Sequence, residues 1–193
     1  NVTSIKFFTN AVSSTTSGID FVASYSGLEL GPGSLDLSIG FNTNSTELGD
    51  KITTPKPISD SGADIFDRKE QGRLISARPG NKFILGLDYS MGNLTIGLNN
   101  TQFGEVTWQH GSDESKDQTF SAKLINDLNV NYQLNDNLSL NLAVNNLANA
   151  YPDVIDTKGD FVTDLGGRFE YPWEVNQFGF MGTNILGTVS YSF

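Results

Sequence analysis

The feature that most constrains this chain is an alternation of apolar and polar residues with a period of two. The pattern recurs in about seven segments, and Leu35–Phe41 and Leu138–Val144 are clear examples. Successive side chains of a β-strand point to opposite faces of a sheet, so each segment has one apolar and one mainly polar face. The sequence therefore predicts an all-β chain. The apolar faces of the segments begin at Ile19, Leu35, Phe83, Leu94, Leu128, Leu138 and Ile185.

The connections between these segments alternate between short and long. Outer-membrane barrels have short turns on the periplasmic side and long loops on the extracellular side, whereas a Greek-key sandwich has no reason to sort its loops in this way. We therefore expect an antiparallel meander that forms part of a membrane β-barrel, with a short helix within residues 64–71 of the longest loop. The short links are Gly27–Gly33, Ser90–Gly92 and Asn135–Asn137, and the long links span residues 44–81, 101–119 and 146–182.

Aromatic residues on the apolar faces gather near one end of the predicted strands. Tyr25, Tyr89 and Tyr132 each precede a short link, and Tyr191 and Phe193 end the last strand. Tyrosine favours a membrane interface, because its ring prefers hydrocarbon and its hydroxyl prefers water. We expect these five residues to form an aromatic girdle at the periplasmic boundary.

Composition excludes several classes of protein. The formal charge of −10 argues against a basic nucleic-acid-binding face, and the absence of cysteine excludes disulfides and thiolate chemistry. No apolar run approaches the 18 residues that indicate a transmembrane helix. The chain opens at Asn1, with neither a start methionine nor a signal segment, so we expect a fragment or a processed product.

Several local patterns resemble the C-terminal barrel region of TonB-dependent outer-membrane receptors. The strongest stretch is residues 128–152, which contains Tyr132-Gln-Leu-Asn-Asp-Asn-Leu-Ser-Leu, Val144-Asn-Asn-Leu and Tyr151-Pro. Phe8-Thr-Asn-Ala followed by Gly18-Ile-Asp-Phe, and the terminal Phe193, are also similar to the family. Ala148 and Asn149 replace the family's usual Phe-Asp.

The resemblance implies that residues 1–193 are the C-terminal portion of a 22-stranded type of barrel whose lumen is plugged. It implies a Gram-negative outer membrane, with TonB-energised uptake of a siderophore, vitamin, oligosaccharide or similar scarce nutrient. A plug domain and a TonB box are absent from this sequence, and contact with the TonB system would go through that missing N-terminal part. The partners would be membrane lipid and the ligand, and an isolated fragment would associate with copies of itself through its unpaired edges.

Two other functions fit the same strands. A passive porin-type barrel would lack a plug, and a soluble β-sandwich with a lectin-like site would enclose Leu37, Leu85, Val130 and Leu140 in a two-layer core. An enzyme would need an acid–base pair, and no spacing of loop carboxylates indicates one. We therefore expect no catalytic residues and no cofactor.

The candidate ligand-binding residues are aromatic residues of the long loops, which could stack on a sugar ring or a siderophore. They are Trp108, Tyr171, Trp173, Phe178 and Phe180, and packing of the loops is the competing interpretation. His110 is the only histidine, and we expect a solvated loop residue and no metal site there. Two groups of acidic loop residues are also expected to be solvated. The first consists of Asp113, Glu114 and Asp117. The second, in the last long loop, consists of Asp153, Asp156, Asp160 and Asp164. The polar faces carry Asp20, Asp36, Asp88 and Asp127, which we expect to line a water-facing wall.

Overall fold

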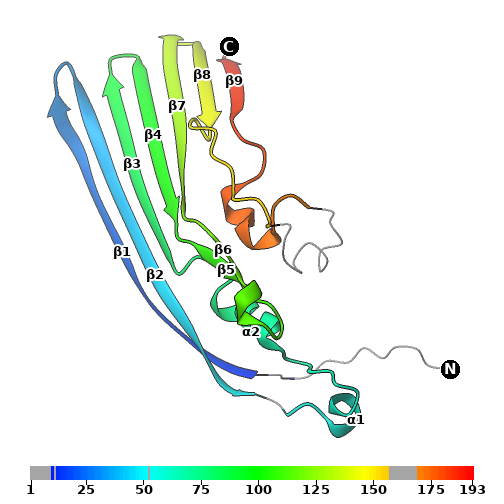
Figure 1. Cartoon of the computed structure of the whole chain (residues 1–193). Coiled ribbons are helices and arrows are strands. Elements are labelled where there is room, and N and C mark those ends of the chain that lie inside the picture. Colours follow the sequence, from blue (N-terminus) through cyan, green and yellow to red (C-terminus); the bar gives the residue numbers. More distant parts are fainter. Residues whose placement is uncertain (1–9, 11, 52, 157–168) are drawn as a thin grey trace.

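The computed structural model describes residues 10, 12–51, 53–156 and 169–193. Its main feature is a single seven-stranded sheet in which each strand pairs with the next in an antiparallel meander (Figure 1). The predicted fold class and number of strands are confirmed, although the sheet does not close on itself within this chain. The strands, in spatial order, are β1 (Val12–Leu30), β2 (Gly33–Lys51), β3 (Asn81–Met91), β4 (Leu94–Phe103), β7 (Lys123–Asn135), β8 (Leu138–Asn145) and β9 (Asn184–Tyr191).

The first two strands are longer than the alternation indicates. The predicted apolar alternation ends near Asn42, but pairing continues to Val12 opposite Lys51. This extension is rich in serine and threonine on both faces, and the hydroxyls of Thr16 and Thr46 hydrogen-bond across it at 2.8 Å. A hairpin with water on both sides has no apolar face, so it leaves no period-two signal.

The remaining elements gather at the end of the sheet opposite the short turns (Figure 1). They are α1 (Lys56–Ser59), α2 (Arg68–Ile75), the paired strands β5 (Val106–Trp108) and β6 (Gln118–Phe120), and the 3₁₀ helices η1 (Glu114–Lys116) and η2 (Trp173–Phe178).

The short helix predicted within residues 64–71 is α2, but it begins at Arg68. The carboxylate of Asp67 accepts a hydrogen bond from the Glu70 amide at 2.9 Å and caps the helix N-terminus. Asp64 instead accepts a hydrogen bond from the Phe66 amide in the turn before the helix. The β5–β6 hairpin was not predicted, because three-residue strands are too short to show alternation.

One face of the seven-stranded sheet is apolar from edge to edge. Strand register joins Tyr25, Leu37, Leu87, Leu98, Leu128, Val144 and Ile185 in one row of neighbours. The face is uncovered by any second sheet among the described residues, and Phe21 and Val189 are 55% and 70% exposed. The two-layer core that a sandwich requires is therefore not formed.

Among the described residues, no helix combines the length and the apolar character that crossing a membrane requires.

Candidate functional site: a membrane-facing band and a loop cap

The girdle tyrosines follow a regular stagger across the sheet. Tyr25 on β1 lies in the same row of paired residues as Leu87 on β3. Along β3, Tyr89 lies two residues beyond Leu87 in the direction of the short turns. Tyr132 lies in the row of Met91, which is again two residues nearer the short turns than Tyr89.

The same step recurs at the last strand. Tyr191 pairs with Leu138, which is two residues nearer the short turns than Leu140, the partner of Tyr132. The four tyrosines therefore step by two residues for every two strands crossed. Two residues are about 6.7 Å and two strand spacings about 9.6 Å, so their line crosses the rows at about 35°.

The angle between the tyrosine line and the rows matches the angle by which strands tilt from the axis of outer-membrane barrels, about 35–45°. If the strands tilt by this amount, Tyr25, Tyr89, Tyr132 and Tyr191 lie at one height along the barrel axis. Tyr25, Tyr132 and Tyr191 are also 59%, 44% and 63% exposed. Their placement supports the girdle, and Phe193 follows two residues after Tyr191 with its ring packed 5.6 Å from that of Tyr191.

The outward apolar face has a second boundary toward the long loops. On β3 it extends six residues from Tyr89 to Phe83, which is about 16 Å along the axis at this tilt before side chains are added. Outer-membrane barrels show an apolar band of about 25 Å. The next outward-facing residue on each central strand is polar, namely Thr43 on β2, Asn81 on β3, Asn100 on β4 and Asn126 on β7.

The inward face of the sheet is polar, as expected for a wall in contact with water. Asp20 accepts a hydrogen bond from Asn42 at 2.7 Å, and Asp36 accepts one from the amide of Gly27 at 2.7 Å. Asp127 accepts from the amide of Asn146 at 2.8 Å. Asp88 and Asp127 border a shallow hollow of about 330 Å³ in this wall.

The long loops form a hydrophobic core of their own, which we call the loop cap (α2, β5, β6, η2 and residues 146–156). Its buried residues come from two loops: Val106, Trp108 and Phe120 from β5 and β6, and Ile155, Val175 and Phe178 from the last loop, which contains η2. Trp108 is 3% and Phe178 6% exposed, so both aromatic candidates lie inside this core. Neither offers a free face to a ligand.

The loop cap rests on the inward side of the wall. The ring of Phe178 packs edge-on against Phe103, with centroids 5.6 Å apart. Lys123 donates a hydrogen bond to Asp153 of the last loop at 2.5 Å. Register places Lys82, Phe103 and Lys123 in one inward-facing row. The loops therefore lean over the lumen side rather than toward the apolar face.

A bidentate ion pair between Arg68 and Asp117 joins α2 to the β5–β6 hairpin. The guanidinium of Arg68 donates two hydrogen bonds of 2.6 Å to the carboxylate of Asp117 and a third, of 3.1 Å, to the carbonyl of His110. These bonds from Arg68 hold the pKa of the Asp117 carboxyl below its ordinary value, and the amide of His110 contributes in the same direction. Bidentate pairs of this kind fix geometry as well as charge.

Replacing Arg68 with methionine is expected to loosen the hairpin, because Asp117 is then left half-buried without its cation. Hydrogen bonds to charged groups contribute about 1.5–3 kcal/mol, so hydrogen exchange of residues 106–120 should speed up by at least tenfold. The control, Lys56→Met on α1, removes a cation outside this contact and should leave the exchange unchanged. Equal exchange in both variants would contradict the role of the pair.

The pH dependence of the same contact follows from the lowered pKa of Asp117. A carboxyl whose folded-state pKa is depressed stabilises the fold above its unfolded value, about 3.9. The contribution is lost as the pH falls through the folded-state pKa. The protection factors of the hairpin amides, which divide out the intrinsic effect of pH on exchange, should therefore be constant from pH 7 to about 5 and fall at lower pH, and Asp117→Asn should reduce this fall.

The other aromatic candidates lie at the surface of the loop cap. Tyr171 stacks between Tyr151 and Phe180, at centroid distances of 6.4 and 5.7 Å. Trp173 is 46% exposed, and the guanidinium of Arg73 lies 5.1 Å from its ring centroid.

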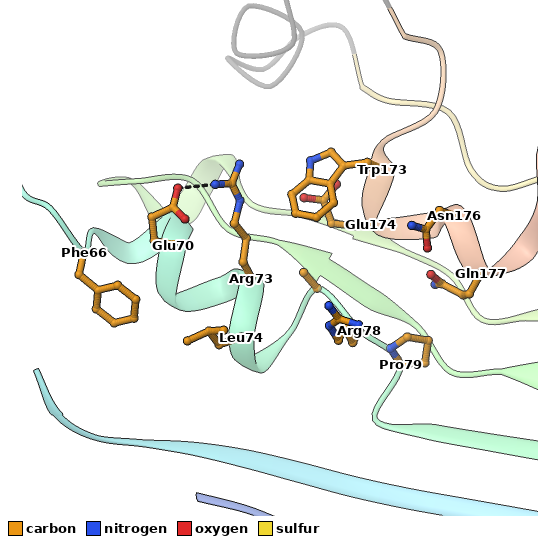
Figure 2. A pocket seen from close by; sticks show the side chains of 11 residues that line it. Phe66, Glu70, Arg73, Leu74, Arg78, Pro79, Trp173, Glu174, Asn176 and Gln177 are labelled. Atoms are coloured by element: carbon orange, nitrogen blue, oxygen red, sulfur yellow. Dashed lines mark hydrogen bonds and ion pairs between the residues drawn. The ribbon is translucent and has the colours of Figure 1, made fainter. Parts of the chain in front are cut away.

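Trp173 borders a pocket of about 490 Å³ between α2 and η2, which Figure 2 shows. Arg73, Arg78, Asn176 and Gln177 also line it. Sequence reasoning missed these polar residues because nothing in the sequence indicates that α2 faces η2.

The remaining polar candidates have structural contacts. Nδ1 of His110 accepts hydrogen bonds from the amides of Ser112 and Asp113, and Asp113 caps η1 through Ser115. No group of metal-binding residues occurs in the described ranges, and Asp160 and Asp164 lie outside them.

Antiparallel strands with one apolar face, short turns at one end and packed loops at the other are the features of a section of an outer-membrane β-barrel wall. The family model "TonB dependent receptor-like, beta-barrel" matches residues 1–147, and the chain belongs to this family. No curated protein matches it.

A chain in the "Structure of the FpvAI-pyocin S2 complex" is similar, with 21% identity and a TM-score of 0.46. The match covers 73% of this chain and 17% of that one, so the chain spans less than a fifth of that protein's length. The family assignment rests on the family model.

Proposed function

We propose that residues 1–193 are the C-terminal portion of an outer-membrane receptor that imports a scarce nutrient with energy from the TonB system. The apolar band, with four tyrosines staggered at the tilt of a membrane barrel, carries the proposal. The family is one of the Gram-negative outer membrane. The earlier strands, the plug and the contact with TonB would be supplied by the rest of the receptor.

The loop cap supports a receptor more than an open pore. Residues from separate loops share one core, and that core is anchored on Phe103 and Lys123 of the inward face. Loops held over the lumen narrow the opening and present surface to a ligand. A passive porin remains the second candidate, and no enzymatic role is proposed.

Cysteine labelling tests the membrane orientation, because residues 1–193 contain no cysteine and any cysteine elsewhere in the receptor can first be replaced with serine. In the full receptor, Asp60→Cys in the long loop should react with a membrane-impermeant maleimide on intact cells. Asp136→Cys in a short turn should react only after the outer membrane is opened, and Leu128→Cys should stay unreactive in both states. Labelling of Asp136→Cys on intact cells would contradict this orientation.

Growth and uptake test the energised step. Cells that express the receptor should accumulate its nutrient only with an intact TonB system, and deletion of TonB should lower uptake to that of receptor-free cells. Uptake that persists without TonB would favour the porin. Correct labelling with no TonB dependence would retain the barrel and overturn the transport mechanism.

A further inference from the structure

We propose that the pocket between α2 and η2 binds a neutral sugar ring of an oligosaccharide. This inference rests on the proposed function only in placing the pocket on the cell surface. The pocket volume of about 490 Å³ lies within the range of small-molecule sites, about 300–1,000 Å³.

The first observation is an aromatic surface beside unused hydrogen-bonding groups. The indole of Trp173 is 46% exposed at the edge of the pocket. In Figure 2, the amides of Asn176 and Gln177 point toward the side on which Arg78 and Trp173 lie. The side chains of Arg78, Asn176 and Gln177 make no hydrogen bond or ion pair within the described part of the chain, and the Nε2 atom of Gln177 is buried.

These groups match the chemistry of a sugar. One face of a pyranose ring consists of C–H groups that pack on an aromatic ring, while its hydroxyls both donate and accept hydrogen bonds. Asn176 and Gln177 each offer a donor and an acceptor, and the planar guanidinium of Arg78 offers several donors in a fixed geometry. A buried donor such as Nε2 of Gln177 costs free energy until a partner fills the pocket.

The charge of the pocket favours a neutral ligand over an anion. Its lining holds two basic residues, Arg73 and Arg78, and two acidic residues, Glu70 and Glu174. Arg73 already pairs with Glu70 on α2, as the dashed line in Figure 2 marks. A site for an anion would show an excess of cations.

The walls of the pocket are held in place before a ligand arrives. Phe178 and Val175 fix η2 in the core of the loop cap. The amide of Thr107 donates to the carbonyl of Ser76 at the end of α2 at 2.8 Å, and Arg68 ties the start of α2 to Asp117. Preorganised walls lower the entropy cost of binding.

A glycan array with the purified full-length receptor in detergent tests the proposal. We expect it to retain at least one neutral oligosaccharide, with a dissociation constant that changes less than twofold between 50 and 500 mM NaCl. Trp173→Leu and Gln177→Leu should each weaken that binding at least tenfold. Asn176→Leu should weaken the binding severalfold. Because Asn176 is exposed, this variant should fold normally and keeps the test valid if Trp173→Leu or Gln177→Leu misfolds. The matched control is Phe169→Leu, which replaces a 63% exposed aromatic residue of the same loop outside the pocket.

Three outcomes would overturn the proposal: no neutral glycan is retained, retained glycans bind all variants equally, or the Trp173-dependent ligand proves anionic and its binding falls with salt. The assay involves no TonB. Glycan binding without TonB-dependent uptake would overturn the transport proposal alone, and uptake of a ligand that ignores Trp173 would overturn the sugar site alone.

Discussion

Replacing Val130 with arginine should destabilise the full receptor's barrel by about 2–4 kcal/mol, the cost of a charge facing lipid near the bilayer midplane. Val130 lies on the outward face between its neighbours Ile96 and Leu142, two residues from Tyr132 and four from the polar boundary at Asn126. Neither neighbouring strand offers it a polar partner at this level. Urea unfolding of the receptor in lipid vesicles measures the change.

The control for this variant is the adjacent residue on the same strand. Asn129→Arg introduces the same charge on the inward face, where Asn129 neighbours Gly97 and Ala143. Its side chain can reach water, so we expect the free energy of unfolding to change by less than about 0.5 kcal/mol. Equal destabilisation by both variants would show that the two faces do not differ in solvent and would overturn the membrane-facing band.

Replacing Phe120 with alanine should destabilise the loop cap by about 3–5 kcal/mol, because a large buried ring is removed and a cavity remains. Phe120 is 2% exposed at the centre of the core that joins β5, β6 and η2. The effect should stay local, since the seven-stranded sheet makes its own ladder of hydrogen bonds. Protease added to intact cells should cut residues 104–122 much faster in the variant.

The matched control is Glu105→Ala, an exposed residue of the same loop that lies next to buried Val106. Its cleavage rate should equal that of the unmodified receptor. Unchanged protection in Phe120→Ala would mean that the loops are not held by a shared core. Loss of the whole barrel from the membrane would mean that the core belongs to the folding of the wall.

The parts of the fold that were predictable are those where a strand has one apolar and one polar face. Alternation located all seven main strands, because a one-residue slip would place Leu98 or Leu140 on the wrong side of the sheet. The outer ends of β1 and β2 were missed because Thr16 and Thr46 meet water on both sides. The β5–β6 hairpin was missed because Val106 and Trp108 are fixed by tertiary packing rather than by a local pattern.

The candidate site shows the same division. Alternation and turn lengths placed the tyrosines near the short turns, and register then supplied the stagger that would align them in a tilted barrel wall. Among the loop aromatics, composition alone did not distinguish buried Phe178 from exposed Trp173, because both occur in one stretch of six residues. The polar pocket residues Arg78 and Gln177 lie almost a hundred residues apart in sequence, and only the packing of α2 near η2 brings them to one pocket.

The shared core of the loops also restricts how such a receptor can evolve. Val106 and Phe120 come from one loop, and Ile155 and Val175 from the next, yet all four are buried against one another. Exchanging one of these loops for that of a relative would leave the other's hydrophobic residues without their complement. New ligand preferences should therefore arise either through coordinated replacement of both loops or through point changes confined to rim residues such as Arg78 and Trp173.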